Sequence, residues 1–279
     1  MIISYKEFNP SPALQQYVDK YWISSFTEAP SHHLSIQKCM PLGMAQVIIH
    51  TMGRDCDIYL DGEWTPLPDA YFVGIYKDAV TWRANCNAVL FGMNLKPECL
   101  MQLFKIPVST LFNDYTDISN FLNKRVNTMA DKMMGLSDPA MLIKIAEDFL
   151  ISRLKSTNEE RTYLEEATNI IRIEKGNISI DSLCKRLYVS ERQLQRSFKD
   201  MLGTSPKTYT RIIRFRNAYE YIQQTKNDKV SMADISYNCG YADQAHFIRD
   251  FKEFAGITPS IVEDSNMQFC QVAPKYALS

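Results

Sequence analysis

A short stretch between residues 192 and 199 carries two arginines, two glutamines and one lysine at spacings that suit one side of a helix. Arginine can pair with a guanine edge through two hydrogen bonds, and glutamine can do the same with an adenine edge. The side chains that point away from the apolar positions of this stretch are Arg192, Gln193, Gln195, Arg196 and Lys199. These residue types in this order predict a surface that contacts DNA bases.

A partial copy of this stretch lies 53 positions further along the chain. The matched pairs are Arg196 and Arg249, Phe198 and Phe251, Lys199 and Lys252, Gly203 and Gly256, and Pro206 and Pro259. The outward positions of the second copy are Gln244, Ala245, His246 and Arg249. Only two of these four are strong hydrogen-bonding readers, so we expect the second copy to read fewer bases.

Each copy sits in a predicted helix that follows a shorter helix and a tight turn. The first short helix is indicated by apolar residues at i, i+3, i+4 and i+7 over 180–187. Ser190 then suits an N-cap, with Gln193 at the capping-box position. In the second copy, Asp243 is the expected N-cap after a turn over 240–242. Two helices joined in this way predict a helix-turn-helix.

The inner faces of these helices are expected to hold the unit together. In the first copy the inward residues are Leu194, Phe198, Met201 and Leu202, and in the second they are Phe247, Phe251 and Phe254. Between the copies, an apolar stripe predicts a helix from Pro206 to about Lys226. The stripe comprises Tyr209, Ile212, Ile213, Phe215, Tyr219 and Ile222.

The connecting helix has a length that suits DNA. About 20 residues at 1.5 Å each make a rod of roughly 30 Å, close to the roughly 34 Å of one DNA turn. We therefore expect the two copies to enter two adjacent major grooves of double-stranded DNA. Lys207 is an expected DNA contact, and Arg211, Arg214 and Arg216 are expected to add positive charge nearby. A single such pattern is often plain helical packing, but two matched copies make that reading improbable.

Charge is unevenly distributed along the 279 residues. Residues 1–160 carry 14 Lys and Arg against 18 Asp and Glu, whereas residues 161–279 carry 17 against 14. Within 179–216 there are nine basic and three acidic residues. A concentrated basic stretch in the second half suggests a polyanionic partner, although a solvated helix face would show the same pattern.

The seven cysteines are scattered and form no C-x-x-C pair. This pattern indicates reduced thiols rather than disulfides or a zinc site. His32 and His33 with Cys39 lack a fourth ligand at a recognisable spacing, so we expect a surface loop and no metal. No apolar run is long enough to span a membrane and no leader pattern is present, so we expect a cytoplasmic protein.

The first half of the chain is predicted to contain both helices and strands. Ser11 and Pro12 predict the start of a helix that ends near Trp22. Short β-branched and aromatic runs then predict antiparallel strands in a small barrel or sandwich: AQVIIH, DIYL, AYFVGIY and NAVLFGMNL. After Pro97 the spacing becomes helical, with helices expected at 98–104, at 107–112, from 116 or 117 through Phe121, Leu122, Val126 and Met129, and from Pro139 to about 150.

The run KSTNEE at 155–160 has no apolar residue and is the expected linker. The predicted fold is α+β: a β-rich barrel with helices over 1–155, followed by an all-α domain of two helix-turn-helix motifs and a long helix over 161–265. The first domain would sense an effector or pair two subunits.

Residues 179–260 resemble the paired helix-turn-helix DNA-binding domain of AraC/XylS-type bacterial transcription regulators. The segments that carry the resemblance are SLCKRLYVSERQLQRSFKDMLGTSPKTYTRIIRFRNAYEYI and SMADISYNCGYADQAHFIRDFKEFAGITP. It implies base contacts from the outward residues of both copies. The family's signature commonly ends in an aromatic and a basic residue, where this chain has Val262 and Glu263. A weaker likeness of the N-terminal part implies a cupin-like barrel for a small-molecule effector or a homodimer contact.

An enzyme with a catalytic barrel is the alternative from another class. A metal triad in the barrel is improbable, because the histidines available there are His32, His33 and His50. Cys99 is better read as a buried thiol than as a reactive one. Trp22, Trp64 and Trp82 could line an effector pocket, but aromatic residues in strands are more often core. We therefore expect a regulator that is not an enzyme and needs no cofactor.

Overall fold

The protein divides into two compact units. The computed structural model describes residues 2–27, 35–53, 56–84, 87–120, 124–154, 162–225 and 230–260. The first unit comprises residues 1–36, 44–74 and 81–159, and the second comprises 37–43, 75–80 and 160–279. The second unit therefore includes two short segments that are distant in sequence from its main part.

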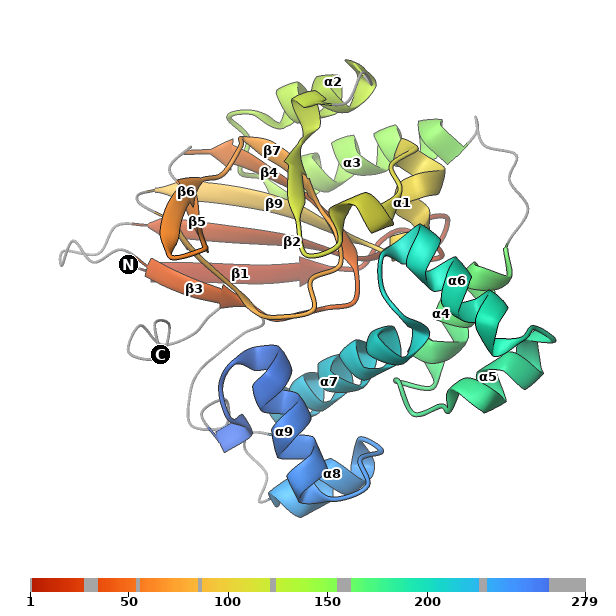
Figure 1. The fold of residues 1–279 in the computed structure, drawn as a ribbon. Coiled ribbons are helices and arrows are strands. Elements are labelled where there is room, and N and C mark those ends of the chain that lie inside the picture. Colours follow the sequence, from red (N-terminus) through yellow and green to blue (C-terminus); the bar gives the residue numbers. More distant parts are fainter. Residues whose placement is uncertain are drawn as a thin grey trace. The chain divides into compact units, whose positions relative to one another are not determined.

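Six strands of the first unit form an antiparallel sheet in the order β1-β2-β9-β4-β7-β10 (Figure 1). Their bounds are β1 Ile2–Phe8, β2 Val18–Thr27, β4 Ala45–Met52, β7 Ala70–Val73, β9 Ala88–Leu95 and β10 Tyr115–Asp117. The side chains of β4 and β9 are buried on both faces of the sheet, which suits their run of apolar and β-branched residues.

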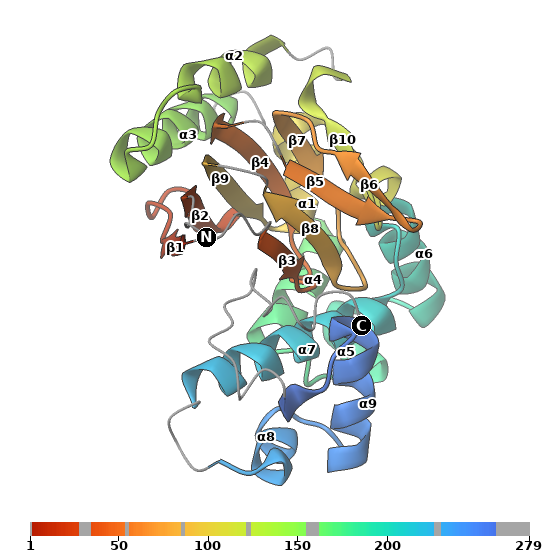
Figure 2. The same ribbon diagram turned by 90° about the vertical axis from the view of Figure 1, so that its left-hand side faces the viewer.

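A second sheet of four strands runs in the order β3-β8-β5-β6. Its strands are β3 Ser35–Cys39, β5 Cys56–Leu60, β6 Glu63–Pro66 and β8 Val80–Ala84. Strands β5 and β8 lie beside the larger sheet in Figure 2, and an edge contact of 5.5 Å between the rings of Phe26 and Trp82 links the two sheets. The β-rich prediction is confirmed. In the described residues, however, the strands make two sheets and do not close into a barrel.

Helices cover the other face of the larger sheet. Helix α1 is Pro97–Phe104, α2 is Lys124–Met133 and α3 is Pro139–Leu154, with short 3-10 turns at Val108–Leu111 and Ile118–Asn120. Phe72 of β7 contacts Phe104 of α1 at 5.0 Å, and Phe104 contacts Phe149 of α3 at 5.9 Å. The helices expected at 98–104 and from Pro139 are present, and the one expected at 107–112 is a 3-10 turn. The helix expected to start at residue 116 or 117 is wrong there, because both residues pair with β7 in strand β10 and helix α2 begins only at Lys124. Phe121 and Leu122 lie outside the described residues.

The helix expected from Ser11 to Trp22 is wrong. A short turn covers 12–17, and the chain then enters β2. The apolar residues of this segment fit a helical spacing, but β2 pairs with β1 on one side and β9 on the other. Its side chains Tyr21, Trp22 and Ile23 are all buried, because both faces of the strand are covered. Tertiary packing has overridden the local spacing.

The second unit is helical. Its helices are α4 Tyr163–Ile173, α5 Ile180–Leu187, α6 Glu191–Leu202, α7 Pro206–Gln224, α8 Met232–Asn238 and α9 Gln244–Ala255. Helix α7 contacts α4 and α6 on one side and α8 and α9 on the other (Figure 1). The six apolar residues expected along α7 are all buried. The two predicted helix-turn-helix motifs and their connecting helix are therefore confirmed as elements.

The linker 155–160 and residues 262 and 263 lie outside the described residues. Among the described helices, none combines the length and the apolar character needed to cross a bilayer.

Candidate nucleic-acid interface

Helix α6, the first candidate reading helix, has a start that is fixed by its side chains. The Ser190 hydroxyl oxygen accepts a hydrogen bond from the Gln193 backbone N–H at 3.3 Å, and the Gln193 side-chain oxygen accepts one from the Ser190 N–H at 2.9 Å. This is the predicted capping box. At the other end, Gly203 adopts a left-handed conformation with φ of 73° and ends the helix.

The two sides of α6 differ as expected, with one exception. Leu194, Phe198 and Leu202 are fully buried. Met201, which was also expected to pack inward, is exposed. The five candidate base-reading residues are all exposed: Arg192, Gln193, Gln195, Arg196 and Lys199. The structure therefore brings the five together on the solvent side of one helix.

Several of these exposed side chains have partners within the helix. Arg196 Nε lies 3.4 Å from Asp200 Oδ2, and Gln195 Nε2 donates to Glu191 Oε1 at 2.8 Å. Lys199 Nζ donates to the Gly203 carbonyl at 3.3 Å. The side-chain oxygen of Gln193 is engaged in the cap, so a two-bond contact to adenine would require Gln193 to leave it.

Helix α9, the second candidate reading helix, is capped by Asp243, whose carboxylate accepts a hydrogen bond from the His246 N–H at 2.7 Å. The side chains of Gln244, Ala245 and Arg249 are exposed. The ring of His246 is only 34% exposed, because it packs edge-on against Tyr241 at 5.3 Å and lies 3.8 Å from Asp250. Fewer polar side chains are fully presented here than on α6.

Three arginines of α7 do not add free positive charge, contrary to expectation. Arg211 bonds Asp250 and Glu253 of α9, at 2.7 Å and 2.5 Å for the shortest contacts. Arg214 donates twice to the Gly176 carbonyl, at 3.0 and 2.8 Å, and Arg216 pairs with Glu220 at 2.8 Å. The three guanidinium groups therefore bind carboxylates or a carbonyl of the second unit, whereas Lys207 is exposed in the first turn of α7.

The Arg211 cluster alters the ionisation of its members. Hydrogen bonding to Asp250 raises the pKa of Arg211 further above its ordinary value, against the opposing effect of burial. Hydrogen bonding from Arg211, with Lys77 contributing, lowers the pKa of Glu253 below its ordinary value. Both shifts favour the charged forms of Arg211 and Glu253.

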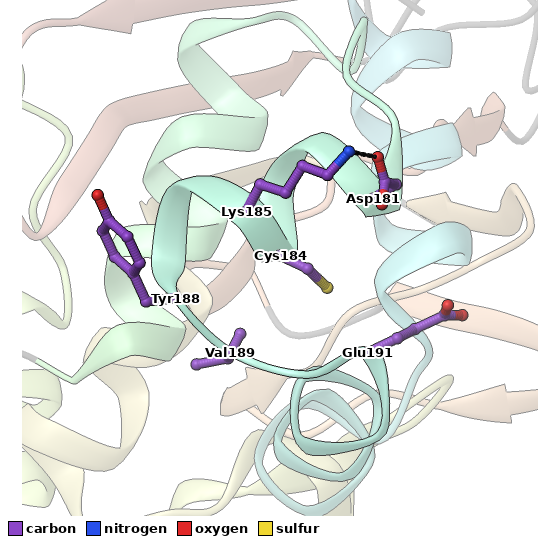
Figure 3. Close-up of a pocket in the computed structure, with 6 residues that line it drawn as sticks. All are labelled: Asp181, Cys184, Lys185, Tyr188, Val189 and Glu191. Carbon is purple, nitrogen blue, oxygen red and sulfur yellow. Dashed lines mark ion pairs between the residues drawn. The ribbon is translucent and has the colours of Figure 1, made fainter.

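A surface hollow lies between α5 and the start of α6 (Figure 3). Its lining comprises Asp181, Cys184, Lys185, Tyr188, Val189 and Glu191. The ammonium group of Lys185 is 2.7 Å from the Asp181 carboxylate, an ion pair drawn in Figure 3. Two carboxylates and one paired lysine do not favour a polyanion, so this hollow is not part of the candidate DNA surface.

Other candidates from the sequence are placed as follows. Cys99 is 2% exposed, which confirms a buried thiol. Trp22 is buried and donates to Asn94 at 3.0 Å. Trp64 lies 4.3 Å under the Arg83 guanidinium. His32 and His33 lie outside the described residues.

Sequence reasoning missed Asp250, which is buried on α9 and lies close to His246. The available signal was an acidic residue on the apolar side of a predicted helix, between Phe247 and Phe254. A buried carboxylate requires a cationic or hydrogen-bonding partner. That partner, Arg211, lies 39 positions earlier and could not be identified from local sequence.

Comparison with known proteins adds two family matches. Residues 183–264 match a family described as a helix-turn-helix domain. Residues 6–117 match a family described as a domain of unknown function (DUF6597).

Among individual proteins, the chain is 27% identical over 154 residues to the Msm operon regulatory protein of Streptococcus mutans, covering 54% of each chain. It is 28% identical over 137 residues to the HTH-type transcriptional regulator ArgR of Pseudomonas aeruginosa, covering 44% of this chain and 40% of that one. The chain thus spans about half the length of these relatives, or less. ToxT from Vibrio cholerae has a similar fold, with a TM-score of 0.50 at 11% identity, covering 94% of this chain and 98% of that chain.

Proposed function

We propose that this protein is a sequence-specific DNA-binding transcription regulator of the AraC type, since residues 183–264 match a helix-turn-helix family. The observation that carries the proposal is the pair of capped helices α6 and α9, joined through α7, with exposed arginine and glutamine side chains near their starts. Such side chains near a helix N-terminus read base edges in the major groove.

The proposed base-reading residues lie on the solvent side of α6 and α9, and all of them are exposed except His246, which is half-buried. On α6 they are Arg192, Gln193, Gln195 and Arg196, with Lys199 beside them, and on α9 they are Gln244, Ala245, His246 and Arg249. Lys207, in the first turn of α7, is a proposed phosphate contact. The 19 residues of α7 support binding to two adjacent major grooves of double-stranded DNA, because they span roughly 29 Å.

For the domain roles, we propose that residues 161–265 bind DNA and that residues 1–155 bind a small effector or pair two copies of the chain. Polar side chains between the two sheets support an effector site. Gln46 and Asn94 are opposite each other on β4 and β9 and are both buried, and His50 is 1% exposed. Neither ring nitrogen of His50 has a hydrogen-bond partner within the described residues, so a bound polar ligand could provide one. The proposed regulator is cytoplasmic and non-enzymatic.

Selection of bound DNA from a random pool tests the proposed function. The full-length chain should enrich one sequence family, with stronger base preference in the part contacted by α6 than in the part contacted by α9. Repeating the selection with small-molecule extracts tests for an effector. Enrichment no greater than that of a chain carrying both Arg196→Ala and Arg249→Ala would overturn the proposal.

A further inference from the structure

We propose that Arg211 is a positioning residue for the second reading helix, holding α9 in the orientation that presents His246 and Arg249 to DNA. This inference rests on the proposed function, since it concerns how one of the two reading helices is set. Arg211 itself lies on α7 and would not contact DNA.

The contacts of Arg211 are directed at α9. Its NH2 nitrogen lies 2.7 Å from Asp250 Oδ1 and its Nε lies 3.4 Å from Asp250 Oδ2, so the guanidinium spans both carboxylate oxygens. The same NH2 group is 2.5 Å from Glu253, and the guanidinium carbon lies 5.0 Å from the Phe254 ring centre. Asp250, Glu253 and Phe254, all on α9, are therefore held by one side chain of the neighbouring helix α7.

Because Asp250 is buried, its ion pair with Arg211 strongly influences the orientation of α9. The Asp250 side chain is 6% exposed and that of Arg211 is 26% exposed. A carboxylate buried to this degree is strongly disfavoured without a cation and hydrogen bonds. Because Asp250 comes one residue after Arg249 and one turn after His246, a rotation of α9 that relieved an unpaired Asp250 would move both proposed readers.

The first reading helix has no equivalent dependence on an ion pair. The position of α6 that matches Asp250 is Ser197, whose hydroxyl forms a 2.7 Å hydrogen bond with the Tyr163 hydroxyl. Loss of Arg211 should therefore affect reading by α9 and leave reading by α6 unchanged.

A second contact acts on the same cluster within the second unit. Lys77, in the segment 75–80, lies 3.2 Å from Glu253, and the Ala79 N–H donates to the Phe254 carbonyl at 2.8 Å. Glu253 is thus shared by two cations, whereas Asp250 depends on Arg211 and the more distant His246. Arg211, rather than Lys77, is the residue whose removal should reorient α9.

The test compares base preference in the two halves of the selected DNA site. For Arg211→Gln, the change in affinity caused by a single base substitution in the half read by α9 should be about tenfold smaller than for the wild type. Changes in the half read by α6 should keep their effect within about twofold, and the salt dependence of binding should stay as in the wild type, because no phosphate contact is lost. Arg216→Gln is the matched control, since it breaks an ion pair within α7 and should leave both halves unchanged.

Two further variants keep the test decisive if Arg211→Gln folds poorly. Glu253→Gln removes the more exposed carboxylate and should cause a smaller loss, about twofold, confined to the same half. Arg211→Gln with Asp250→Asn removes both buried charges and should restore part of the lost preference. Unchanged preference in the α9 half for Arg211→Gln and Glu253→Gln, or a shallower salt dependence, would overturn the inference. Failure of the wild-type chain to select any DNA sequence would instead overturn the proposed function.

Discussion

Arg196 differs from the other arginines of the second unit in how far it is exposed. Its side chain is 84% exposed, against 26% for Arg211 and 17% for Arg216. The exposed pair with Asp200 contributes little to stability, so Arg196 is available to a ligand. We predict that Arg196→Ala weakens specific binding by about 1–3 kcal/mol and relaxes base preference, measured by titration of the selected site and its single-base variants. Lower affinity with unchanged base preference would contradict a base contact.

For Lys207 we propose a contact with a DNA phosphate rather than with a base. It is exposed at the start of α7 and, as a point charge, suits a phosphate rather than a base edge. Lys207→Ala should weaken binding to all sequences alike and reduce the slope of log affinity against log salt by about 0.9. Titrations over a range of salt concentrations measure this slope, and an unchanged slope would remove the assignment.

His50 makes the first unit sensitive to acid. Burial lowers the pKa of His50 from 6.5 to about 4, although the nearby Asp69 carboxylate opposes the shift. The unfolded chain therefore binds a proton at higher pH than the folded chain, and stability falls as the pH drops from about 6.5 to about 4, by about 3 kcal/mol in total.

We predict that His50→Phe removes this pH-dependent loss without destabilising the chain at pH 7. The substitution eliminates two buried nitrogens that have no partner within the described residues and retains a ring against Tyr71, 5.6 Å away. Urea unfolding at pH 7 and pH 5 measures both effects. An equal fall in stability between the two pH values for the variant and the wild type would contradict the assignment.

Serine residues cap four helices of the second unit: α5, α6, α7 and α8. Ser190 begins α6 and Ser231 begins α8, each within a complete capping box. Ser190→Ala should lower the free energy of unfolding by about 1 kcal/mol and reduce DNA affinity, because the start of α6 carries the proposed readers. Ser231→Ala is the matched control: a similar loss of stability is expected, with a smaller effect on affinity. Equal effects on DNA affinity would show that the cap of α6 has no special part in reading.

The elements that the sequence predicted well are those with local signals. The bounds of α5, α6 and α9 follow from caps and apolar spacing that lie within each helix. Strand β2 was mistaken for a helix because its structure depends on pairing with β9, about 70 residues away in the sequence. The separation of the strands into two sheets depends likewise on pairings between distant segments.

The same limit applies to the candidate site. Exposure of the α6 readers followed from a helical pattern, since the opposite side was apolar. Whether an arginine faces solvent or a carboxylate depends on distant residues, as the bonds from Arg211 to Asp250 and from Arg214 to Gly176 show. The sequence therefore identified which side chains of α6 face solvent, but not which basic residues of α7 are bound to other residues of the unit.

Within the second unit, the two proposed reading helices are unequal in the side chains they expose. Helix α6 exposes two arginines and two glutamines, whereas α9 exposes one of each, an alanine and a half-buried histidine. We therefore expect base preference to be stronger in one half of the DNA site. The connecting helix α7 contacts both motifs and sets the distance between them.

The central claim is that α6 and α9 bind adjacent major grooves on one face of DNA. Measuring the spacing of the two contacts on DNA tests this claim most directly. On a selected site, hydroxyl-radical footprinting of the wild-type chain should show two protected patches about one helical turn apart. Inserting about half a turn of DNA between the patches should abolish the protection assigned to α9 and weaken binding, while a sequence change outside both patches should not. A single protected patch, or full affinity after the insertion, would contradict the account.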